Sequence, residues 1–477
     1  MNHEFLYHRI ANRFEQMIEK KALLAGDKLP SVRQLSKDQN VSMSTAFQAY
    51  YYLESKGLIE ARPKSGYYVR YNPSMTIKTP STRIPEIPLR KDQPLLQLLA
   101  EVYKSLDKED LVWLSLAAPD PAYLPVAKLN KSMKYAISHH NCTRYAEIQG
   151  IKRLRTQIAK LAFNWGGIYQ PDDIVVTAGC MEAIIMCLQT ITQPGDAVAI
   201  QSPTYFGIFM ALESLGLTAI EVKTDAETGI DIPSLEKTLD AYPEIKACLF
   251  VSNFNNPLGS LMSDTQKKEL VKMLNKREVA LIEDDIYGEL YFGSARPRTC
   301  KSFDTTGNVM YCSSLSKSLA PGARIGWIIP GRWKNQVIEQ KLVHTISTNT
   351  AAQEGMAHFL EKGRCELHMK RLRKELYLNY FRYLKVITDH FPSDIRISRP
   401  KGGFVLWLEL DKNIDAYQLY SKALESGISI APGQLFSKQG NYRNFIRLSF
   451  AAPLNKKTIW GIEWLGKLLM EPYIFKV

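Results

Sequence analysis

The sequence lacks the features of a membrane, secreted or metal-dependent protein. Its seven cysteines are scattered and form no C-x-x-C pair, which disfavours a metal cluster and fits free thiols in a reducing cytoplasm. No apolar run approaches the roughly 18 residues that a membrane span needs. The first residues, M-N-H-E-F, lack the basic and then apolar layout of a signal peptide. These absences predict a cytoplasmic protein with no membrane partner and no metal site.

What the sequence does have is length and positive charge. Its 477 residues, 45% of them apolar and 23% charged, have the composition of an ordinary soluble chain, and the length predicts about two to four domains. The net charge is +13, which permits a nucleic acid or another polyanion as a partner. Residues 1–78 carry 12 Lys and Arg against 7 Asp and Glu, so the excess is concentrated at this end of the chain.

The first 70 residues predict three helices and a hairpin. A stripe of apolar residues predicts a first helix over 5–24, ended by Gly26; its members are Leu6, Ile10, Phe14, Met17 and Ile18. The other predicted elements are a second helix over 29–38, a third helix from 41–45 to 53 with Ser42 as N-cap and a buried stripe of Ala46, Tyr50 and Leu53, and two strands, 58–62 and 66–70, around a basic turn.

Helices of this order followed by a basic hairpin make a winged helix-turn-helix, whose third helix enters the major groove of DNA at its N-terminal end. Small polar side chains there reach base edges and phosphates, and basic side chains elsewhere lie on phosphates. The predicted contacts are Arg33, Ser42, Ser44, Thr45, Gln48, Arg62 and Lys64. The alternative is a small three-helix protein-interaction module, and the local excess of positive charge favours double-stranded DNA.

Residues 71–94 contain five prolines, which predicts an extended, semi-rigid tether. At about 3.1 Å per residue it would reach on the order of 70 Å, enough to place the first domain over a partner subunit as easily as over its own. A short amphipathic helix is expected over 95–106. We therefore divide the chain into a winged helix-turn-helix domain (1–71), a linker with a short helix (72–110) and a large domain (111–477) with a small subdomain over about 360–477.

From residue 111 onward, apolar strand-like runs alternate with helical patterns. The runs are I-V-V-T-A, A-V-A-I-Q, A-I-E-V-K, A-C-L-F-V, A-L-I-E-D, V-M-Y-C-S and I-G-W-I-I. Such alternation predicts an α/β fold with a mostly parallel sheet covered by helices. Because ligands bind beyond the carboxyl ends of the strands of such sheets, the chemistry is expected just after these runs.

The run C-S-S-L-S-K-S-L-A-P-G-A-R-I-G-W, residues 312–327, combines an amine with an anion site. Lys317 is a nucleophile for carbonyl carbons when its pKa is lowered, Arg324 grips a phosphate bidentately, and Ser314 adds a hydroxyl donor. This combination suits a cofactor that carries an aldehyde and a phosphate. The alternative is a basic turn on a surface loop.

Four other strand ends carry polar or aromatic groups. Gly179, Cys180 and Met181 open a helix whose backbone amides form an anion site. The remaining three offer Tyr205 for stacking on a flat ring, the amide of Asn256, and the carboxylate of Asp284 followed by Tyr287. A carboxylate at a strand end keeps a ring nitrogen protonated. Each group also has a structural alternative, namely a tight turn, a core position or a helix cap, and it is their succession that favours a site.

These motifs resemble known families. L-P-S-V-R-Q-L, V-S-x-S-T and G-L-I-E-A-R-P-K-S-G-Y-Y-V look like the winged-helix domain of the GntR family of bacterial regulators. Y-A-E-I-Q-G-I-K-R-L-R, N-N-P-L-G, D-D-I-Y, S-x-S-K, P-G-A-R-I-G-W, G-G-F-V-L-W, A-P-G-x-x-F and R-L-S-F resemble the fold-type I pyridoxal-phosphate (PLP) aminotransferases. The two together, in this order, resemble the MocR subfamily.

The resemblance implies roles for the residues. Lys317 would carry the cofactor as an imine, and Asp284, chosen over Asp285 because the D-x-x-Y spacing ends on Tyr287, would meet the pyridine nitrogen. The remaining implied contacts are Tyr287 and Asn256 to the ring oxygen, Tyr205 stacked on the ring, Gly179, Cys180, Met181, Ser314 and Arg324 around the phosphate, Tyr145 from the other subunit, and Arg447 on a substrate carboxylate. Two departures are Met43, where an arginine often follows Val-Ser, and Ala118, where a glycine is usual.

The resemblance implies a cytoplasmic bacterial homodimer that binds operator DNA and senses PLP or an amino compound. The leading hypothesis is therefore a PLP-dependent transcription regulator. The rival is an active aminotransferase whose DNA-binding domain is secondary. The retention of Lys317, Asp284 and Arg447 favours this rival. A third possibility is a PLP-binding scaffold that docks to another protein.

Overall fold

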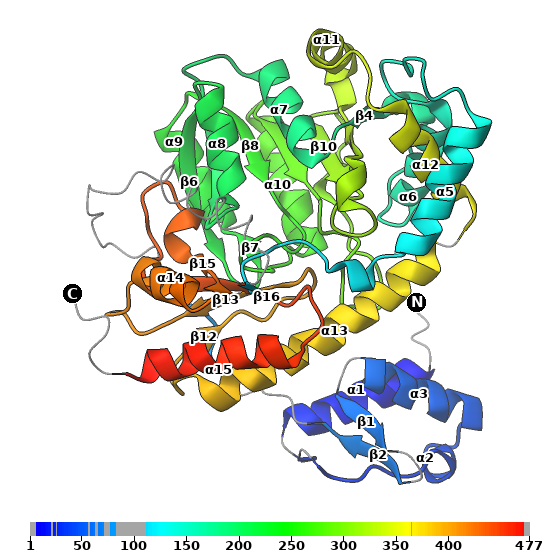
Figure 1. Ribbon diagram of the computed structural model, residues 1–477, viewed down its shortest axis with the longest axis vertical. Coiled ribbons are helices and arrows are strands. Elements are labelled where there is room, and N and C mark those ends of the chain that lie inside the picture. Colours follow the sequence, from blue (N-terminus) through cyan, green and yellow to red (C-terminus); the bar gives the residue numbers. More distant parts are fainter. Residues whose placement is uncertain are drawn as a thin grey trace.

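The computed structural model describes residues 6–20, 22–24, 26–55, 58–62, 65–70, 77–82, 111–363 and 365–471. Two parts are visible in Figure 1: a small N-terminal part, residues 6–70, called the head here, and a large part, residues 111–471, called the body. Lys64, most of the predicted linker and the predicted helix over 95–106 lie outside the described residues. No helix within the described ranges is long and apolar enough to cross a membrane.

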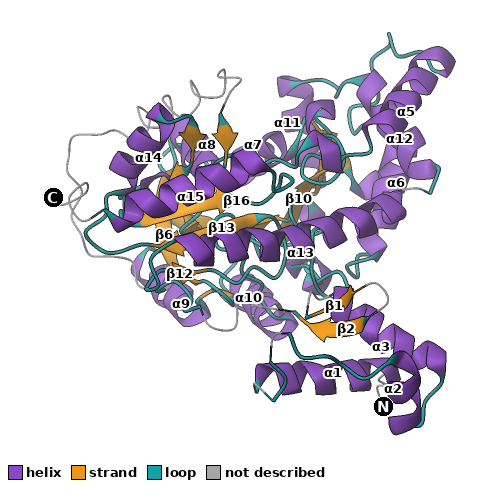
Figure 2. Cartoon of the chain, turned by 60° about the horizontal axis from the view of Figure 1, so that its bottom comes forward, coloured by secondary structure: helices purple, strands orange, loops and turns teal. Residues whose placement is uncertain are grey.

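The head contains the predicted winged helix-turn-helix elements. They are α1 (Leu6–Glu19), α2 (Val32–Asp38), α3 (Met43–Ser55), β1 (Ile59–Arg62) and β2 (Gly66–Val69), the last two paired antiparallel. Ala46, Tyr50 and Leu53 are fully buried, as their spacing predicts. Figure 2 shows the head beside α13 (Cys365–His390) of the body.

The first helix is shorter than the sequence predicts. It ends at Glu19 rather than at 24 because the backbone N–H groups of Ala22 and Leu23 both turn back to the Met17 carbonyl, at 2.8 and 3.1 Å. Helix ends are commonly closed by such backward hydrogen bonds. Leu6, which the predicted stripe places in the core, is instead exposed.

Residues 77–82, within the predicted linker, are fastened to the body. The backbone N–H of Ser81 donates to Glu409 Oε2 at 2.7 Å, and its hydroxyl donates to Glu409 Oε1 at 3.1 Å. The Ile397 N–H donates to the Lys78 carbonyl at 2.9 Å. Only residues 71–76 separate the head from this fastened segment, and a chain of that length spans at most about 25 Å. The predicted reach of 70 Å is wrong for this reason: the linker is anchored partway along its length.

The body is built on an eight-stranded sheet of order β4-β11-β10-β9-β8-β5-β6-β7. The four central pairings, β10-β9, β9-β8, β8-β5 and β5-β6, are parallel, and the outer pairings are antiparallel. All seven predicted runs lie in this sheet. The strands are β4 (Val175–Thr177), β5 (Ala197–Ser202), β6 (Thr218–Asp225), β7 (Gly229–Ile230), β8 (Ile245–Phe250), β9 (Ala280–Asp284), β10 (Val309–Ser314) and β11 (Gly326–Ile329).

Helices cover both faces of this sheet (Figure 1). One apolar cluster joins it to α7 (Cys180–Ile191), α8 (Phe206–Ser214) and α11 (Lys334–His344), and another joins it to α9 (Ile232–Ala241) and α10 (Asp264–Lys276). A third cluster lies under α5 (Val126–His139), α6 (Lys152–Phe163) and α12 (Thr350–Glu361). The near-continuous burial of β5 and β9 follows from this double covering.

A second, four-stranded antiparallel sheet of order β12-β13-β16-β15 forms the small subdomain. It packs with three helices and a short parallel pair into one apolar cluster. The elements are β12 (Arg396–Ile397), β13 (Val405–Glu409), β15 (Ala431–Pro432), β16 (Phe445–Ser449), α13 (Cys365–His390), α14 (Ala416–Glu425), α15 (Lys456–Met470), β3 (Val112–Trp113) and β14 (Ile428–Ser429). The linker anchor at Glu409 therefore belongs to this small sheet.

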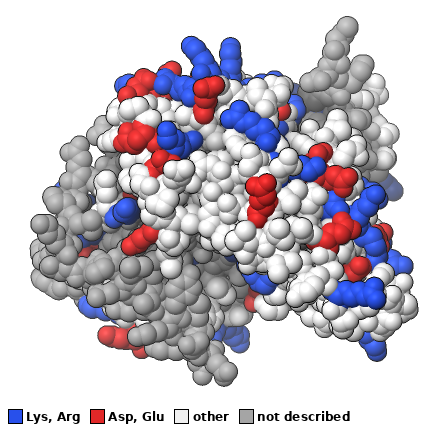
Figure 3. Space-filling model, turned by 90° about the horizontal axis from the view of Figure 1, so that it is seen from above, with Lys and Arg blue, Asp and Glu red and all other residues white. Residues whose placement is uncertain are grey.

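The charge on the body is mixed. On the face shown in Figure 3, which looks down on the body from above, positive and negative side chains are interspersed. Among the described residues on that face, no broad surface of one sign is seen, so they do not form the continuous basic groove expected for binding a nucleic-acid backbone.

Candidate cofactor site and DNA-binding head

Lys317 lies in the turn after β10, at the edge of the large sheet. Its Nζ donates to the Ala117 carbonyl at 2.5 Å. Burial and the neighbouring Arg447 lower the pKa of the Lys317 amine to about 8, against the opposing influence of Asp284. A lysine in this condition is a nucleophile near neutral pH.

Asp284 is the last residue of β9 and is only 8% exposed. Its Oδ1 accepts from the Cys180 thiol at 3.2 Å and from the Ile286 N–H at 3.1 Å. Burial raises the pKa of Asp284 to about 6, although both hydrogen bonds and Lys317 act in the other direction. Asp284 has no salt-bridge partner among the described residues, so its carboxylate is available to a cationic group of a ligand.

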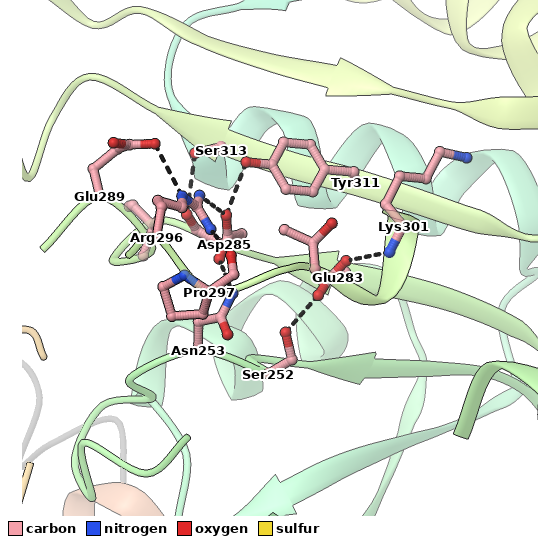
Figure 4. A network of polar contacts seen from close by, with 12 residues as sticks. Ser252, Asn253, Glu283, Asp285, Glu289, Arg296, Pro297, Lys301, Tyr311 and Ser313 are labelled. Carbon is pink, nitrogen blue, oxygen red and sulfur yellow. Dashed lines mark hydrogen bonds and ion pairs between the residues drawn. The ribbon is translucent and has the colours of Figure 1, made fainter. Parts of the chain in front are cut away.

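The neighbouring carboxylate, Asp285, is occupied. It pairs with the buried guanidinium of Arg296, and it accepts from the Tyr311 hydroxyl at 2.9 Å and the Asn253 amide at 2.8 Å. Figure 4 shows this network together with Glu283, which is bonded by Ser252. The structure therefore separates the two adjacent carboxylates, leaving Asp284 for the site.

A cradle for an anion forms where α7 begins. Gly179 has φ 102°, and a Cβ there would collide with the Arg324 guanidinium, so only glycine lets the arginine lie against the helix start. Arg324 itself adopts the left-handed region and donates to the Ala178 carbonyl at 3.1 Å and to Ser316 Oγ at 3.3 Å. Among the described residues no carboxylate pairs with it. A helix N-terminus joined by an unpaired guanidinium attracts phosphate.

The other predicted phosphate ligands surround this cradle. Cys180 and Met181 are the first residues of α7, and the Ser314 hydroxyl accepts from the Ser316 N–H at 3.2 Å. Ser316 was given no role from the sequence, although it lies in the S-x-S-K motif. Its contact with Arg324 depends on the turn after β10, which the motif alone does not describe.

Arg447 approaches from the small sheet, on β16. It is 3% exposed; one terminal nitrogen donates to Asn256 Oδ1 at 3.3 Å, the other donates to the Ser115 carbonyl, and its buried Nε has no partner among the described residues. Burial lowers the pKa of Arg447 to about 10. A buried guanidinium without a carboxylate is suited to bind one from a ligand.

The remaining predicted residues divide into two groups. Tyr287 and Asn256 are buried beside Lys317 and Arg447, with Lys317 Nζ 6.0 Å from the centre of the Tyr287 ring. Tyr205 lies at the N-cap position of α8, without a capping hydrogen bond from its side chain, and is close enough to influence the pKa of Arg447. Tyr145 is 83% exposed on the loop between α5 and α6, and the structure does not bring its side chain to the site of its own chain.

The predicted DNA-contacting residues are mostly at the surface. Ser44 and Gln48 are exposed on α3, and Arg33 is exposed on α2. Ser42 accepts from the Thr45 N–H at 3.1 Å, and the two hydroxyls lie 2.8 Å apart, so both are engaged in capping α3. Arg62 pairs with the exposed Glu60 at 2.9 Å, a surface ion pair of little strength.

The described groups fit one kind of cofactor. Three groups meet at the carboxyl ends of β4, β9 and β10. They are the Lys317 amine with its lowered pKa, the buried Asp284 carboxylate, and the anion cradle formed by Gly179 and Arg324. These are the complements of an aldehyde, a protonated ring nitrogen and a phosphate. The fold and site therefore define a PLP-binding body of the fold-type I aminotransferase class, joined to a winged helix-turn-helix head.

Comparisons with known proteins agree with this description. Residues 112–459 match the family Aminotransferase class I and II, and residues 6–69 match the Bacterial regulatory proteins, gntR family. The uncharacterized HTH-type transcriptional regulator YjiR of Escherichia coli (strain K12) is 35% identical over 97% of this chain and 98% of its own. YdcR of the same strain, described in the same words, is 36% identical over 98% and 99%.

A solved structure extends the comparison to the cofactor. The α-aminoadipate aminotransferase LysN of Thermus thermophilus, complexed with N-(5'-phosphopyridoxyl)-L-leucine, matches with a TM-score of 0.71 and 26% identity, covering 80% of this chain and 95% of that chain. The chain belongs to the MocR subfamily of GntR-type regulators, and PLP is the cofactor of its body.

Proposed function

We propose that this protein is a homodimeric transcription regulator that binds operator DNA through its head and alters that binding when its body takes up PLP or an amino compound. Lys317 attaches the cofactor, Asp284 holds its ring nitrogen, and Gly179, Ser314 and Arg324 hold its phosphate. Arg447 takes the carboxylate of an amino-acid-like effector. The winged helix-turn-helix head, and the regulators with which the chain shares its whole length, support the DNA-binding part.

The observation that carries the proposal is the division of the site between two sheets. Lys317 and Asp284 follow strands of the large sheet, whereas Arg447 lies on β16 of the small sheet. The neighbouring strand β13 ends at Glu409, which holds Ser81 of the linker. A ligand that bridges Lys317 and Arg447 therefore acts on the sheet to which the head is fastened.

The segment after the linker also responds to such a ligand. The Ser115 and Ala117 carbonyls accept from Arg447 and Lys317. A carboxylate on Arg447 competes with the first contact, and attachment at Lys317 removes the second. Either event favours a different placement of this segment, so a ligand shifts the population between two arrangements to the extent that it binds them unequally.

Basic side chains predominate around a cavity between the head and α13. The cavity has a volume of about 410 Å³, and its charged lining consists of Glu60, Arg62 and Arg70 of the head and Arg382 and Lys385 of α13. Like charges that face one another repel. This arrangement supports a head that changes its placement readily when its anchor moves.

The homodimer is supported by exposed apolar side chains on the body. Tyr145 is 83% exposed, and the α11 region exposes Leu342, Val343 and Ile346. Exposed apolar side chains of this size are suited to burial in an interface with a second subunit. In the homodimer that we propose, Tyr145 reaches the site of the partner subunit.

The test is fluorescence anisotropy of the full-length protein on labelled DNA from upstream of its own gene, with and without PLP, at a stated salt concentration. We expect binding tighter than to random DNA and a change with PLP of about five- to 150-fold, the usual range of coupling between sites. Glu409→Gln weakens the anchor and should reduce the change while leaving DNA binding intact. Glu463→Gln, on α15 of the same subdomain, is the matched control.

Two outcomes oppose the proposal. If no DNA is bound specifically, the regulator function is wrong. If specific binding is the same with PLP and with each member of a panel of amino acids, the sensing function is wrong.

The second candidate function is that of a working aminotransferase. It is favoured by one observation, the joint presence of Lys317, Asp284 and the unpaired Arg447 in the same site. Incubation of the PLP-loaded protein with the same amino acids and a keto acid distinguishes the two functions. Sustained turnover would make the protein an enzyme as well as a DNA-binding protein.

A further inference from the structure

The helix that enters DNA in this fold, α3, carries no positive charge. Its sequence, Met43 to Ser55, contains no Lys and no Arg. Its exposed face is formed by Met43, Ser44, Phe47, Gln48 and Tyr51, whereas Ala46, Ala49, Tyr50 and Leu53 face the core of the head. Residues three and four apart lie on one face of a helix, so this set forms a continuous surface.

Most of this face is apolar. Met43 is 47% exposed, Phe47 52% and Tyr51 45%, and none of them belongs to the apolar cluster of the head. The three are spaced four residues apart, and they begin at the N-terminal end of α3, the end that meets base edges in a helix-turn-helix. An exposed apolar stripe at the position of base recognition requires a partner with apolar groups.

The major groove offers one apolar group, the C5-methyl of thymine. Guanine is most often read by Arg or Lys, which α3 lacks, whereas adenine is read by the amide of Gln or Asn. Gln48 lies on the exposed face beside Phe47. An A·T pair therefore offers a methyl group to the apolar side chains on this face and an adenine edge to Gln48. A G·C pair offers neither of these groups.

We propose that α3 reads A·T pairs, with Met43 and Phe47 packing on thymine methyl groups and Gln48 bonding to adenine. This inference rests on the proposed DNA-binding function and specifies its target. Phosphate contacts come from basic residues elsewhere in the head, such as the exposed Arg33 on α2. Affinity for the backbone and recognition of the bases are thus divided between different elements.

The test begins with selection of binding sites from random duplex DNA by the full-length protein. Each thymine of the selected site is then replaced by deoxyuridine, which removes only the C5-methyl and keeps base pairing. Burial of one methyl group corresponds to about fourfold in affinity. We expect a loss of this size at one or two thymines of each half-site and none at the others.

A double-mutant cycle assigns the contact. Phe47→Ala should weaken specific binding and should abolish the effect of deoxyuridine at the thymine that Phe47 touches. Leu24→Ala is the matched control, since Leu24 is an exposed apolar residue of the head outside α3. Phe47→Arg should shift the selected sites toward guanine. Because position 47 is exposed, the arginine should not disturb the packing of α3.

The outcomes separate this inference from the proposed function. Absence of any sequence preference would overturn both. Sequence-specific binding that is indifferent to deoxyuridine at every thymine would overturn only the thymine readout. A Phe47→Ala protein that binds DNA like wild type but changes its oligomeric state would also overturn it, because the apolar face would then be a protein interface.

Discussion

The head and the body present their functional groups in opposite ways. In the body, Asp284, Asn256 and Arg447 are each less than a tenth exposed. Asp284 ends β9, Asn256 lies in the loop after β8, and Arg447 lies within β16. In the head, the apolar side chains on the face of α3 that we propose for DNA reading are about half exposed and lie outside the apolar core. A cofactor site of this kind is pre-formed, whereas the DNA-reading surface is completed by its partner.

This difference has an energetic consequence. Buried charges of the body depend on their neighbours, because a charge left without its partner in the interior is costly. Exposed side chains of the head are surrounded by water and contribute little to stability. Substitutions should therefore damage the body through folding and the head through binding, and the predictions below test that contrast.

The largest effect is expected at the buried network behind Asp284. Arg296→Met leaves Asp285 buried without its counterion and should lower the free energy of unfolding of the body by about 3–5 kcal/mol. All seven tryptophans lie within the body, so urea unfolding followed by tryptophan fluorescence measures it separately from the head. The double variant Asp285→Leu/Arg296→Met should recover part of the loss.

The matched control is Asp389→Ala, which breaks an exposed pair with Lys385 at 2.9 Å. Exposed pairs of this kind contribute only about 0.3–0.5 kcal/mol. Equal losses for Arg296→Met and Asp389→Ala would contradict the contrast between buried and exposed charges in this body.

The strand ends of the large sheet could be predicted from the sequence, because a strand that is covered on both faces requires a continuous run of apolar residues. Lys317 and Asp284, which are far apart in the chain, are brought together for that reason, whereas Arg447, on β16 of the small sheet, was indicated only by the family resemblance. The contacts between them could not be predicted. The Cys180 thiol bonds to Asp284, whereas only its backbone amide had been expected to act, and Ser115 and Ala117 had no expected role, since each contact depends on the three-dimensional path of a loop.

The head shows the same limit in another form. Periodicity identifies the buried side of α3 correctly, because Ala46, Tyr50 and Leu53 must pack on α1 and α2. It does not identify which exposed residues bind DNA. Small polar residues were chosen by chemistry, and the exposures of Phe47 and Tyr51 became visible only when the packing of the helix was known. The position of Tyr145 is a parallel case, since its predicted role involves another chain.

The next effect concerns the pH dependence of cofactor attachment. Because the pKa of Lys317 is lowered to about 8, its amine is an ammonium below that pH and a neutral nucleophile above it. The rate of covalent attachment of PLP should therefore rise about fiftyfold from pH 6 to pH 8 and level off above pH 9. The rate is measured by the visible absorbance that appears after PLP is mixed with the protein.

Two variants fix the cause of this pH dependence. Asp284→Asn removes a charge that favours the ammonium, so the inflection should move to lower pH, whereas Arg447→Gln should move it to higher pH. Lys317→Ala has no amine and should show no attachment at any pH. An inflection that stays in place in both of the first two variants would mean that burial alone sets the state of Lys317.

The smallest effect compares one kind of helix cap in the two parts. Ser42 caps α3 in the head, and Ser263 caps α10 in the body, where it accepts from the Gln266 N–H at 3.3 Å. Replacement of either serine by alanine should lower stability by about 1 kcal/mol. In the body this loss should appear in urea unfolding alone, with DNA binding unchanged.

In the head the same loss should also weaken DNA binding, because the Ser42 cap orders the end of α3 that meets the bases. Ser42→Asn separates the cap from the hydroxyl, since asparagine caps helices as well as serine does. If Ser42→Asn binds DNA like wild type while Ser42→Ala binds about fivefold more weakly, Ser42 acts by shaping the helix end. Equal weakening by both variants would instead mean that the Ser42 hydroxyl contacts DNA directly. The DNA-binding surface of the head would then include a hydroxyl that hydrogen bonds to Thr45 already hold in place.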